Sequence, residues 1–540
     1  LSLYNGQKSA IFQPAKDYSS ASAIYMQTRK PLFKGEKKNN LNIGVKGGSF
    51  STINPSLLWE HRFNERISSS ISTEYMYTSG RYKFTYAKKD GYDTTAVRQN
   101  GDVRMLRLEN AFFGKVPKGE WKAKAYLYNS ERGYPGAAVR EEPGKFRHQD
   151  RQWDTNLFVQ GSFQNYFKPW YSLLANGKYA YDYLHYLSDP RLDVTTMYVD
   201  NHYRQQEIYA SAAHLFTIYP WWRMSLSNDF QWNALRADLI DFVYPTRNTI
   251  LTSAATSFDF NRLMLQASLL YTHVDDNTRT KGANAGTKNK YTPSVIATWQ
   301  PLTKLPLNVR AFYKKVFRMP TLNDLYYTFI GNKDLKPEYT TQYDVGITFS
   351  HTWNNHWLKS LDLQIDGYYN EVDDKIIAMP TSNQFRWTMI NLGHVEIRGL
   401  DAAIRGEWGF GKVELSTLFN YTYQKAQDFT DPTSEWYGGQ IPYIPWHGGS
   451  IILNGSYQTW SCNYSFIYTG ERYEAVANIP ENYAQPWYTH DFSLSKTFQW
   501  GKTGIRVTAE INNIFNQQYE VVQCYPMPGT SFKIKLNVML

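Results

Sequence analysis

The residues that could do chemistry in this 540-residue chain do not assemble into a catalytic motif. Residues 406–412 (GEWGFGK) match the beginning of a phosphate-binding loop, but Val413 stands where a magnesium-binding Ser or Thr is needed. A strand pattern then follows where such a loop requires the start of a helix. The sequence also has no HExxH motif, nucleophile elbow or CxxC pair. We therefore predict that the chain is not an enzyme and uses no cofactor.

Possible metal ligands are present, but they lack the spacing of a metal site. Paired aspartates at 275–276 and 373–374 could hold calcium in loops, yet neither pair has the ligand spacing of a calcium loop. Residues 317–320 superficially resemble a haem-receptor box, but no histidine lies between them and His351. His185, beside an expected long loop, is interpreted as a solvated histidine. We predict no metal site, and haem binding stays a minor alternative.

The elements that must position these residues are strands. Aromatic residues make up 16% of the chain and charged residues 20%, which excludes both a disordered polymer and a helical membrane protein. No run approaches the roughly 18 to 20 apolar residues that a membrane-spanning helix needs. The dominant pattern alternates with period two, so that successive side chains face opposite sides of a strand. In residues 413–423, for example, one face is mostly apolar and the other mostly polar.

Counting from Asn42, we find 22 alternating segments, and the connections between them alternate in length with few exceptions. Short turns are expected at one end, as at 64–65, 261–262 and 501–502, and long loops at the other, as at 318–337. In hydrocarbon every backbone N–H and C=O needs an internal partner, so strands can span a membrane only in a closed sheet. The predicted fold is therefore all-β: a transmembrane antiparallel β-barrel of about 22 strands in outer-membrane lipids, with short periplasmic turns and long extracellular loops.

Three further features favour a membrane barrel over a large soluble β protein. The expected strands exceed the ~9 to 11 residues that a tilted strand needs to cross, so the walls should protrude from the bilayer. Aromatic residues near segment ends, such as Trp170, Trp221 and Trp460, predict interfacial girdles. The alternating residues 532–540 end the chain on a strand, which we expect to pair with the first strand. No propeller or solenoid repeat supports the soluble alternative.

Four segments carry motifs of one known family. They are FRMPTLNDLYYTFIGNKDLKPEYTTQYDVGITF at 317–349, INLGHVEIRGLDAAI at 390–404, INNIFNQQYEVVQCYPMPGTSFKIKLNVML at 511–540 and SERGYPGAAVR at 130–140. With these segments the chain resembles a TonB-dependent outer-membrane receptor of the Bacteroides type. The residues in the places of the family motif, which we interpret as structural, are Arg318, Pro320, Asp324, Leu325, Gly331, Asn332, Leu335, Pro337, Glu338, Gly399, Asn513, Phe515 and Gly529.

The most specific of these motifs predicts a loop. Pro320 and Pro337 cannot donate hydrogen bonds to a strand ladder, so the residues between them should not form a strand. Glu338 should open the next strand. We interpret Arg318 and Glu338 as satisfying polar groups at the barrel rim, in preference to contacting a ligand directly.

The resemblance also implies a domain organisation and an energy source. Residues 1–35 resemble the last part of the family's plug domain, and residues 36–540 are the predicted barrel. Most of the plug and any energy-coupling box are missing from the sequence given. If both lie upstream, the resemblance implies that a periplasmic TonB-type energy protein pulls on the plug, with the proton gradient of the inner membrane supplying the work.

The function that the resemblance implies is import of a scarce, bulky nutrient such as a siderophore, cobalamin or glycan-type ligand. The long loops would form an outer vestibule, in which we expect aromatic ligand contacts. These are Tyr134, Tyr326, Tyr327, Phe329, Trp436, Tyr437 and Tyr443. The net charge of +10 favours an anionic ligand, such as a ferric siderophore or a phosphate-bearing cofactor, but the basic residues are too scattered for a nucleic-acid site. The alternative is a plug-deficient, receptor-like barrel that serves as a scaffold subunit and docks surface lipoproteins.

Overall fold

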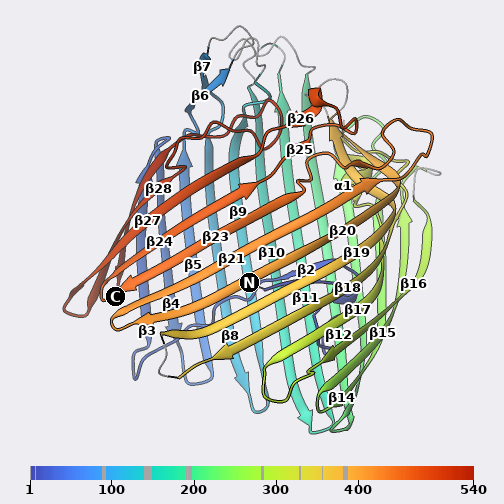
Figure 1. Ribbon diagram of the computed structural model, residues 1–540, viewed down its shortest axis with the longest axis vertical. Helices are drawn as coiled ribbons and strands as arrows, with labels where there is room; N and C mark the ends of the chain where they lie inside the picture. The colour runs from blue at the N-terminus through green and yellow to red at the C-terminus, as the bar shows by residue number, and fades with distance from the viewer. Residues whose placement is uncertain are drawn as a thin grey trace.

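The computed structural model describes residues 2–6, 8–87, 93–138, 149–189, 191, 198–280, 285–327, 330–354, 357–380 and 387–540. Figure 1 shows that most of them form long tilted strands wrapped into a cylinder. None of the helices among these residues has the length and apolar character needed to cross a membrane.

In the described part of the chain, 22 strands form the wall of a closed antiparallel barrel, which confirms the predicted fold. They are β3 (Asn39–Gly48), β4 (Thr52–Arg62), β5 (Ile67–Thr78), β8 (Val103–Val116), β9 (Gly119–Tyr134), β10 (Asp150–Lys168), β11 (Tyr171–Ser188), β12 (Val199–Tyr219), β13 (Trp222–Ala237), β14 (Thr246–Phe260), β15 (Leu263–Asn277), β16 (Thr287–Trp299), β17 (Leu307–Arg318), β18 (Glu338–Thr352), β19 (Leu358–Pro380), β20 (Trp387–Phe410), β21 (Val413–Asp428), β23 (His447–Tyr457), β24 (Trp460–Thr469), β27 (Trp487–Trp500), β28 (Thr503–Asn512) and β29 (Ser531–Met539).

The remaining elements lie in the N-terminal segment and in the loops. The N-terminal segment contains β1 (Ser2–Asn5), η1 (Ala15–Tyr18) and β2 (Ser22–Tyr25). The loops contain β6 (Tyr82–Ala87), β7 (Asp93–Arg98), α1 (Leu322–Tyr326), β22 (Gly439–Gln440), β25 (Arg472–Tyr473), η2 (Pro480–Asn482) and β26 (Tyr483–Ala484).

The barrel closes where the last strand meets the first. β29 pairs with β3 in antiparallel register, with Val538 opposite Ile43 and Leu536 opposite Val45. This pairing satisfies the backbone groups of both strands and leaves no free sheet edge in the wall. The expectation that the terminal strand closes the cylinder is confirmed.

Connections at the two ends of the barrel differ in length, as predicted. The end that we call the turn end has tight connections such as 117–118, 220–221 and 411–412. The opposite end, the loop end, carries long connections such as 319–337, the β17–β18 loop. The β3–β4 connection is an exception, because residues 49–51 form a tight turn at the loop end.

The wall strands put apolar side chains outside and polar ones inside. In β18, Tyr343, Val345 and Ile347 are exposed on the outer face, whereas Gln342 and Asp344 are buried toward the interior. This arrangement is the reverse of a water-soluble barrel, and it matches a wall with lipid outside and a polar lumen.

The wall is much taller on one side than on the other. β19 and β20 have 23 and 24 residues, whereas β29 and β3 at the closing seam have 9 and 10. A tilted strand needs only ~9 to 11 residues to cross the hydrocarbon, so the tall side extends well beyond it, as expected.

The N-terminal segment lies inside the barrel, where Figure 1 places the N-terminus and β2. Its backbone amides at Ala15 and Lys16 donate to the two carboxylate oxygens of Asp229 on β13, at 3.0 and 2.8 Å. Ile11, Ala15 and Tyr18 pack on apolar side chains of β14 and β15. The segment is therefore seated on one inner wall by matched polar and apolar contacts.

Charged side chains also hold the N-terminal segment against the wall. Lys314 of β17 is fully buried and donates to the carbonyl oxygen of Ser20 at 2.7 Å and to that of Gly6 at 3.2 Å. Farther along the segment, Arg29 pairs with Glu60 and Lys30 pairs with Glu120. These residues belong to β4 and β9, so the segment contacts more than one side of the lumen before it enters β3.

Candidate ligand-binding site

The β17–β18 loop begins directly after Arg318 and ends before Glu338, as its two prolines predicted. Thr321 caps α1: its hydroxyl accepts from the Asp324 amide at 3.1 Å, while the Asp324 carboxylate accepts from the Thr321 amide at 2.8 Å. Arg318 lies 3.6 Å from the Asp324 carboxylate and 3.5 Å from the Glu338 carboxylate. These contacts tie together the base of the loop, which supports the structural role expected for Arg318 and Glu338.

A buried ion pair anchors the start of the loop to the wall. Arg247 of β14 donates to both carboxylate oxygens of Asp276 on β15, at 2.5 and 2.6 Å, and to the carbonyl oxygen of Pro320 at 2.6 Å. The side chains of Arg247 and Asp276 are only 9% and 3% exposed. Arg247 cannot move away from Asp276 without leaving a buried charge unpaired. Its hydrogen bond to Pro320 therefore fixes the position of Pro320 relative to the wall.

The second half of the loop is held by an asparagine and a glycine of the motif. The Asn332 amide group donates to the carbonyl oxygen of Met389 on β20 at 3.0 Å. Gly331 lies so close to the Tyr327 backbone that a Cβ atom would approach it to 2.7 Å. Leu335 is buried, and Pro337 directly precedes β18. The motif therefore fixes the path of the loop over the lumen.

The apolar side chains of the loop pack inward, and this corrects one expectation. We predicted Tyr326 as a ligand contact in the outer vestibule, which requires an exposed side chain, but only 9% of it is exposed. Leu322, Leu325 and Tyr326 are spaced three and one residues apart, so they share one face of α1. That face packs on the inner wall, in a cluster with Tyr203, Leu235, Ala237, Leu335 and Ile376. Phe329, the neighbouring ligand candidate, lies outside the described residues.

Tyr327 borders a chamber on the inner wall. The cavity has a volume of about 270 Å³. It is lined by Asp154, Asn156, Asp182, Tyr183, Leu184, Tyr203, Gln205, Asn323 and Tyr327. The ring centroids of Tyr203 and Tyr327 are 4.5 Å apart. Burial raises the pKa of Tyr327 to about 12, so its hydroxyl remains neutral and can donate or accept a hydrogen bond.

The acidic residues of this chamber have partners. Arg132 lies 3.1 Å from the Asp154 carboxylate, and the Asn156 amide donates to Asp182 at 2.6 Å. Most of the polar lining consists of carboxylates, amides and hydroxyls on three adjacent strands. The chamber can therefore accept and donate several hydrogen bonds to one polar ligand.

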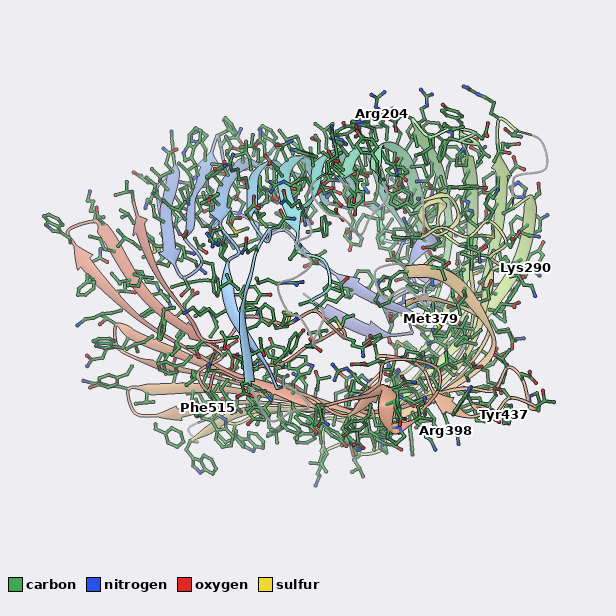
Figure 2. All side chains as sticks on the ribbon, turned by 90° about the horizontal axis from the view of Figure 1, so that it is seen from above. Arg204, Lys290, Met379, Arg398, Tyr437 and Phe515 are labelled. Carbon is green, nitrogen blue, oxygen red and sulfur yellow. The ribbon has the colours of Figure 1, made fainter. Side chains whose placement is uncertain are left out.

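The three predicted ligand residues of the β21–β23 loop, Trp436, Tyr437 and Tyr443, differ in exposure. Trp436 and Tyr437 are exposed, and the Tyr437 ring contacts Phe429 edge-on at 5.1 Å. Figure 2 places Tyr437 at the outer rim of the barrel rather than above the opening. Tyr443 is partly buried, and its backbone amide donates to Tyr473 at 2.7 Å. Burial raises the pKa of Tyr443 to about 12.

Another part of the mouth is covered by the β6–β7 hairpin, which Figure 2 shows extending across the opening. The Tyr82 hydroxyl donates to the carbonyl oxygen of Pro526 at 2.6 Å, which fixes the hairpin to the β28–β29 loop. Tyr134, at the end of β9, is exposed and donates to Gln152 at 2.9 Å. Of the predicted ligand residues that are described, Tyr327 alone lines the chamber; Tyr134, Trp436, Tyr437 and Tyr443 lie elsewhere around the mouth.

The other motif residues make local packing contacts. A Cβ atom on Gly399 of β20 would meet a tyrosine hydroxyl at 2.5 Å, and one on Gly529 would meet an asparagine oxygen at 2.1 Å. Asn513 is buried and donates to the carbonyl oxygen of Pro528 at 3.3 Å. Phe515 is largely exposed. These contacts leave room only for hydrogen at both glycines and support a structural interpretation of Asn513.

One group of potential metal ligands was missed by the sequence analysis. His185 and His202 lie opposite each other on β11 and β12, with imidazole centroids 4.0 Å apart. His185 Nε2 is 2.7 Å from a carboxylate oxygen of Asp200, and the ligating atoms of all three residues lie within 4.8 Å of one another. The interpretation of His185 as a solvated loop histidine is wrong, because this residue is in a strand and has a carboxylate partner. Strand register, which the alternation alone does not give, brings the three together.

The comparison with family models settles the family. The model described as "TonB dependent receptor-like, beta-barrel" matches residues 57–514, most of the chain. The chain belongs to the TonB-dependent receptor family. This receptor is accordingly an outer-membrane β-barrel, as predicted.

Curated relatives of the receptor include two vitamin B12 transporters named BtuB. The one from Photobacterium profundum is 28% identical over 244 residues, covering 44% of this chain and 36% of the relative. The one from Vibrio vulnificus is 31% identical over 207 residues, covering 38% of this chain and 29% of the relative. The receptor therefore aligns with about a third of the length of these relatives.

Solved structures agree with the fold over nearly the whole receptor. The copper transporter OprC superposes with a TM-score of 0.74 at 14% identity, covering 100% of this chain and 85% of OprC. The siderophore receptor PiuA from Acinetobacter baumannii also gives a TM-score of 0.74, at 12% identity, covering 98% of this chain and 85% of PiuA. At these identities the agreement shows the shared fold.

Proposed function

We propose that this receptor imports a bulky, amide-rich nutrient of the cobalamin class across the outer membrane, driven by a periplasmic TonB-type protein. The family membership supports active nutrient transport, and the vitamin B12 transporters among the relatives support the ligand class. Residues 2–35 act in this proposal as part of the plug.

The chamber beside Tyr327 is the observation that carries the ligand class. Its described lining contains carboxylates, side-chain amides and tyrosine hydroxyls, with neither lysine nor arginine. Carboxylates and amide oxygens accept hydrogen bonds from primary amides, and the Asn and Gln amides and Tyr hydroxyls can donate to amide oxygens. A neutral ligand with many peripheral amides, such as a corrinoid, is complementary to this lining. This chemistry favours such a ligand over the anionic one that the net charge suggested.

The N-terminal segment supplies a route for energy coupling. Asp229 and Lys314 hold it through hydrogen bonds to its backbone, so a pull on the segment would have to break these bonds. Each such bond contributes only about 1 to 3 kcal/mol, which a protein-transmitted force can overcome one bond at a time. Release of this seat would open the lumen between the chamber and the turn end.

Uptake by a deletion strain tests the proposal. Cells that lack the receptor should lose growth on limiting cobalamin while keeping growth on single iron or glycan sources. Uptake of labelled cobalamin should stop when a protonophore collapses the proton gradient. A defect confined to an iron or glycan source would overturn the ligand class, and no defect on any source would contradict import altogether.

Variants of the chamber connect uptake to the site. Tyr327→Phe removes a hydroxyl that can hydrogen-bond the ligand, and Asp182→Asn replaces a charged acceptor by a neutral amide with one acceptor oxygen fewer, so each should weaken cobalamin binding about tenfold. Tyr437→Phe changes the same kind of group at the outer rim and serves as the matched control. Equal losses for Tyr437→Phe and Tyr327→Phe would place the ligand outside the chamber.

A further inference from the structure

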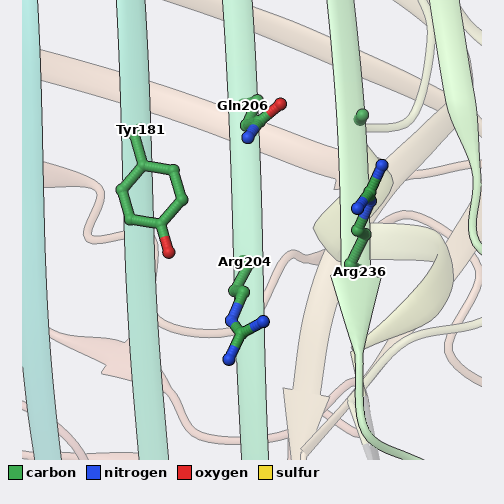
Figure 3. A pocket seen from close by; sticks show the side chains of 5 residues that line it. Tyr181, Arg204, Gln206 and Arg236 are labelled. Atoms are coloured by element: carbon green, nitrogen blue, oxygen red, sulfur yellow. The ribbon is translucent and has the colours of Figure 1, made fainter.

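A second pocket lies on the outer face of the barrel, where the transport route does not pass. It has a volume of about 190 Å³, spans β11, β12 and β13, and is lined by Tyr181, Arg204, Gln206, Ala234 and Arg236. Figure 3 shows the labelled side chains on the same face of the three strands. Tyr203 and Leu235, their neighbours along β12 and β13, point inward to the cluster under α1. By strand alternation the pocket residues therefore face away from the lumen.

The two arginines of this pocket form an unusual pair. Arg204 lies directly opposite Arg236 in the register of β12 and β13. Like charges at directly opposed positions destabilise a sheet. Among the described residues, neither guanidinium has an ion-pair partner within 4.0 Å, because the nearby Asp200 and Asp238 lie beside His202 instead. An anion between the arginines would remove the repulsion.

The level of the pocket indicates where that anion comes from. Beyond Gln206 and Ala234 toward the turn end, the outer face becomes apolar: Ile208 and Phe230 are exposed there, and Ile250 continues the apolar band on β14. On the loop side lie the polar residues His202 and Asp200. The arginines thus stand at the boundary between hydrocarbon and headgroups, where a basic side chain is tolerated and lipid phosphates lie.

We propose that this pocket binds the phosphate of an anionic lipid headgroup in the leaflet on the loop side. Each guanidinium presents a planar fork of donors suited to phosphate oxygens. The Tyr181 hydroxyl and the Gln206 amide offer further donors beside them. Ala234 is buried and its small side chain forms the floor, so the headgroup can approach the sheet. The acyl chains of the same lipid would then lie over Ile208 and Phe230.

A lipid explains the site better than a free anion does. Free phosphate would use only the polar side chains of the pocket, whereas a lipid also covers the exposed apolar side chains on its turn side. The proposal concerns this outer face and holds whether or not the receptor carries cobalamin.

Native mass spectrometry of the full chain in a neutral detergent tests the proposal. The probes are short-chain phosphatidic acid, short-chain phosphatidylcholine as a lipid without net charge, and inorganic phosphate. We expect one tightly bound phosphatidic acid, with weaker binding of phosphatidylcholine and of inorganic phosphate. Arg204→Gln and Arg236→Gln should each weaken phosphatidic acid binding about tenfold, since each removes a charge-assisted interaction.

Two further variants test whether the lipid binds because of the shape of this pocket or because of positive charge anywhere on the outer face. Ala234→Phe fills the floor while keeping both arginines, and it should lower binding as much as losing one arginine. Arg398→Gln is the matched control: Arg398 is exposed on β20, on a different side of the barrel in Figure 2, and is ion-paired with Glu396 at 3.0 Å. It should bind phosphatidic acid like the parent.

The following results would contradict the proposal. Unchanged binding in the Arg204→Gln/Arg236→Gln double variant overturns the proposal, and so does an equal loss in Arg398→Gln. Inorganic phosphate that binds as tightly as phosphatidic acid would make the site a free-anion site and overturn the lipid assignment. A heat-modifiable shift in gel mobility shows that each variant retains the folded barrel. A loss of binding can then be attributed to the substitution and not to unfolding.

Discussion

Two loops at the same end of the barrel are built in opposite ways. The β17–β18 loop, residues 319–337, turns its apolar side chains onto the inner wall and is anchored by a buried ion pair. The β21–β23 loop, residues 429–446, keeps Trp436 and Tyr437 exposed at the rim. The first loop thus buries its aromatic Tyr326, whereas the second buries Ile441 but presents its aromatic residues to solvent.

This difference indicates that the two loops have different roles, one in fixing the structure of the mouth and the other in offering surface to partners. The anchored loop carries most residues of the family motif, and their contacts fix its path and form one side of the chamber. A motif that is easy to find in the sequence therefore marks structure here, while exposed aromatic residues without a motif remain available to partners. The two loops should respond differently to the same kinds of substitution.

Arg247→Gln should have the largest effect on this contrast. It leaves the buried Asp276 carboxylate without its ionic partner and removes the hydrogen bond to the carbonyl oxygen of Pro320, at a cost of about 3 to 5 kcal/mol. The amide of Leu325 should lose exchange protection, while the rim loop stays unchanged. Arg318→Gln is the control, because Arg318 is well exposed and its ion pairs contribute at most about 1 kcal/mol. Equal losses would mean that the buried pair does not anchor the loop.

Leu325→Ala tests the apolar half of the anchor. Leu325 is fully buried on the inner face of α1, so truncation should destabilise the docked loop by about 2 to 4 kcal/mol. Hydrogen exchange of α1 amides measures the loss. Leu239→Ala, at a partly buried position against the same cluster, should cost less. If both variants behave alike, α1 is not held by the packing described here.

Trp436→Ala combined with Tyr437→Ala should change stability little. Both side chains are exposed, and substitutions at such positions are usually within about 0.5 kcal/mol. Thermal unfolding of the purified barrel should match that of the parent. A destabilisation as large as that of Leu325→Ala would show that Trp436 and Tyr437 contribute to the core despite their exposure, and the contrast between the aromatic residues of the two loops would fail.

The barrel could be predicted because its determinants are local. Alternating residues repeat along each strand, and the short turn at 220–221 predicts that β12 and β13 are neighbours. The turn does not give the exact pairing of Arg204 with Arg236, because a β-bulge between Thr217 and Tyr219 shifts the register by one residue. The outward face of each arginine could be predicted from alternation, whereas their direct opposition could not.

The chamber could not be predicted, because it depends on contacts between distant residues. Tyr326 is in an outer loop, where exposure is the usual expectation, but it is buried because α1 meets Tyr203 and Leu235 of strands more than eighty positions earlier. Long loops have no alternation that reveals such docking. Aromatic composition alone therefore indicated candidates without showing which ones would be covered.

The smallest effect in the comparison is a response of the rim loop to acid. The Thr433 hydroxyl and amide both donate to the Asp431 carboxylate, at 2.7 and 2.9 Å, and these bonds hold the pKa of Asp431 below its ordinary value of 3.8. A lowered pKa means that the charged form stabilises the turn, fully above 3.8, and that this contribution is lost as the pH falls through the lowered pKa. Exchange protection of the Thr433 amide, corrected for the intrinsic pH dependence of exchange, should therefore fall in acid. Asp431→Asn keeps an acceptor without the charge and should abolish that dependence. Protection that falls equally in the variant would assign the loosening to another group.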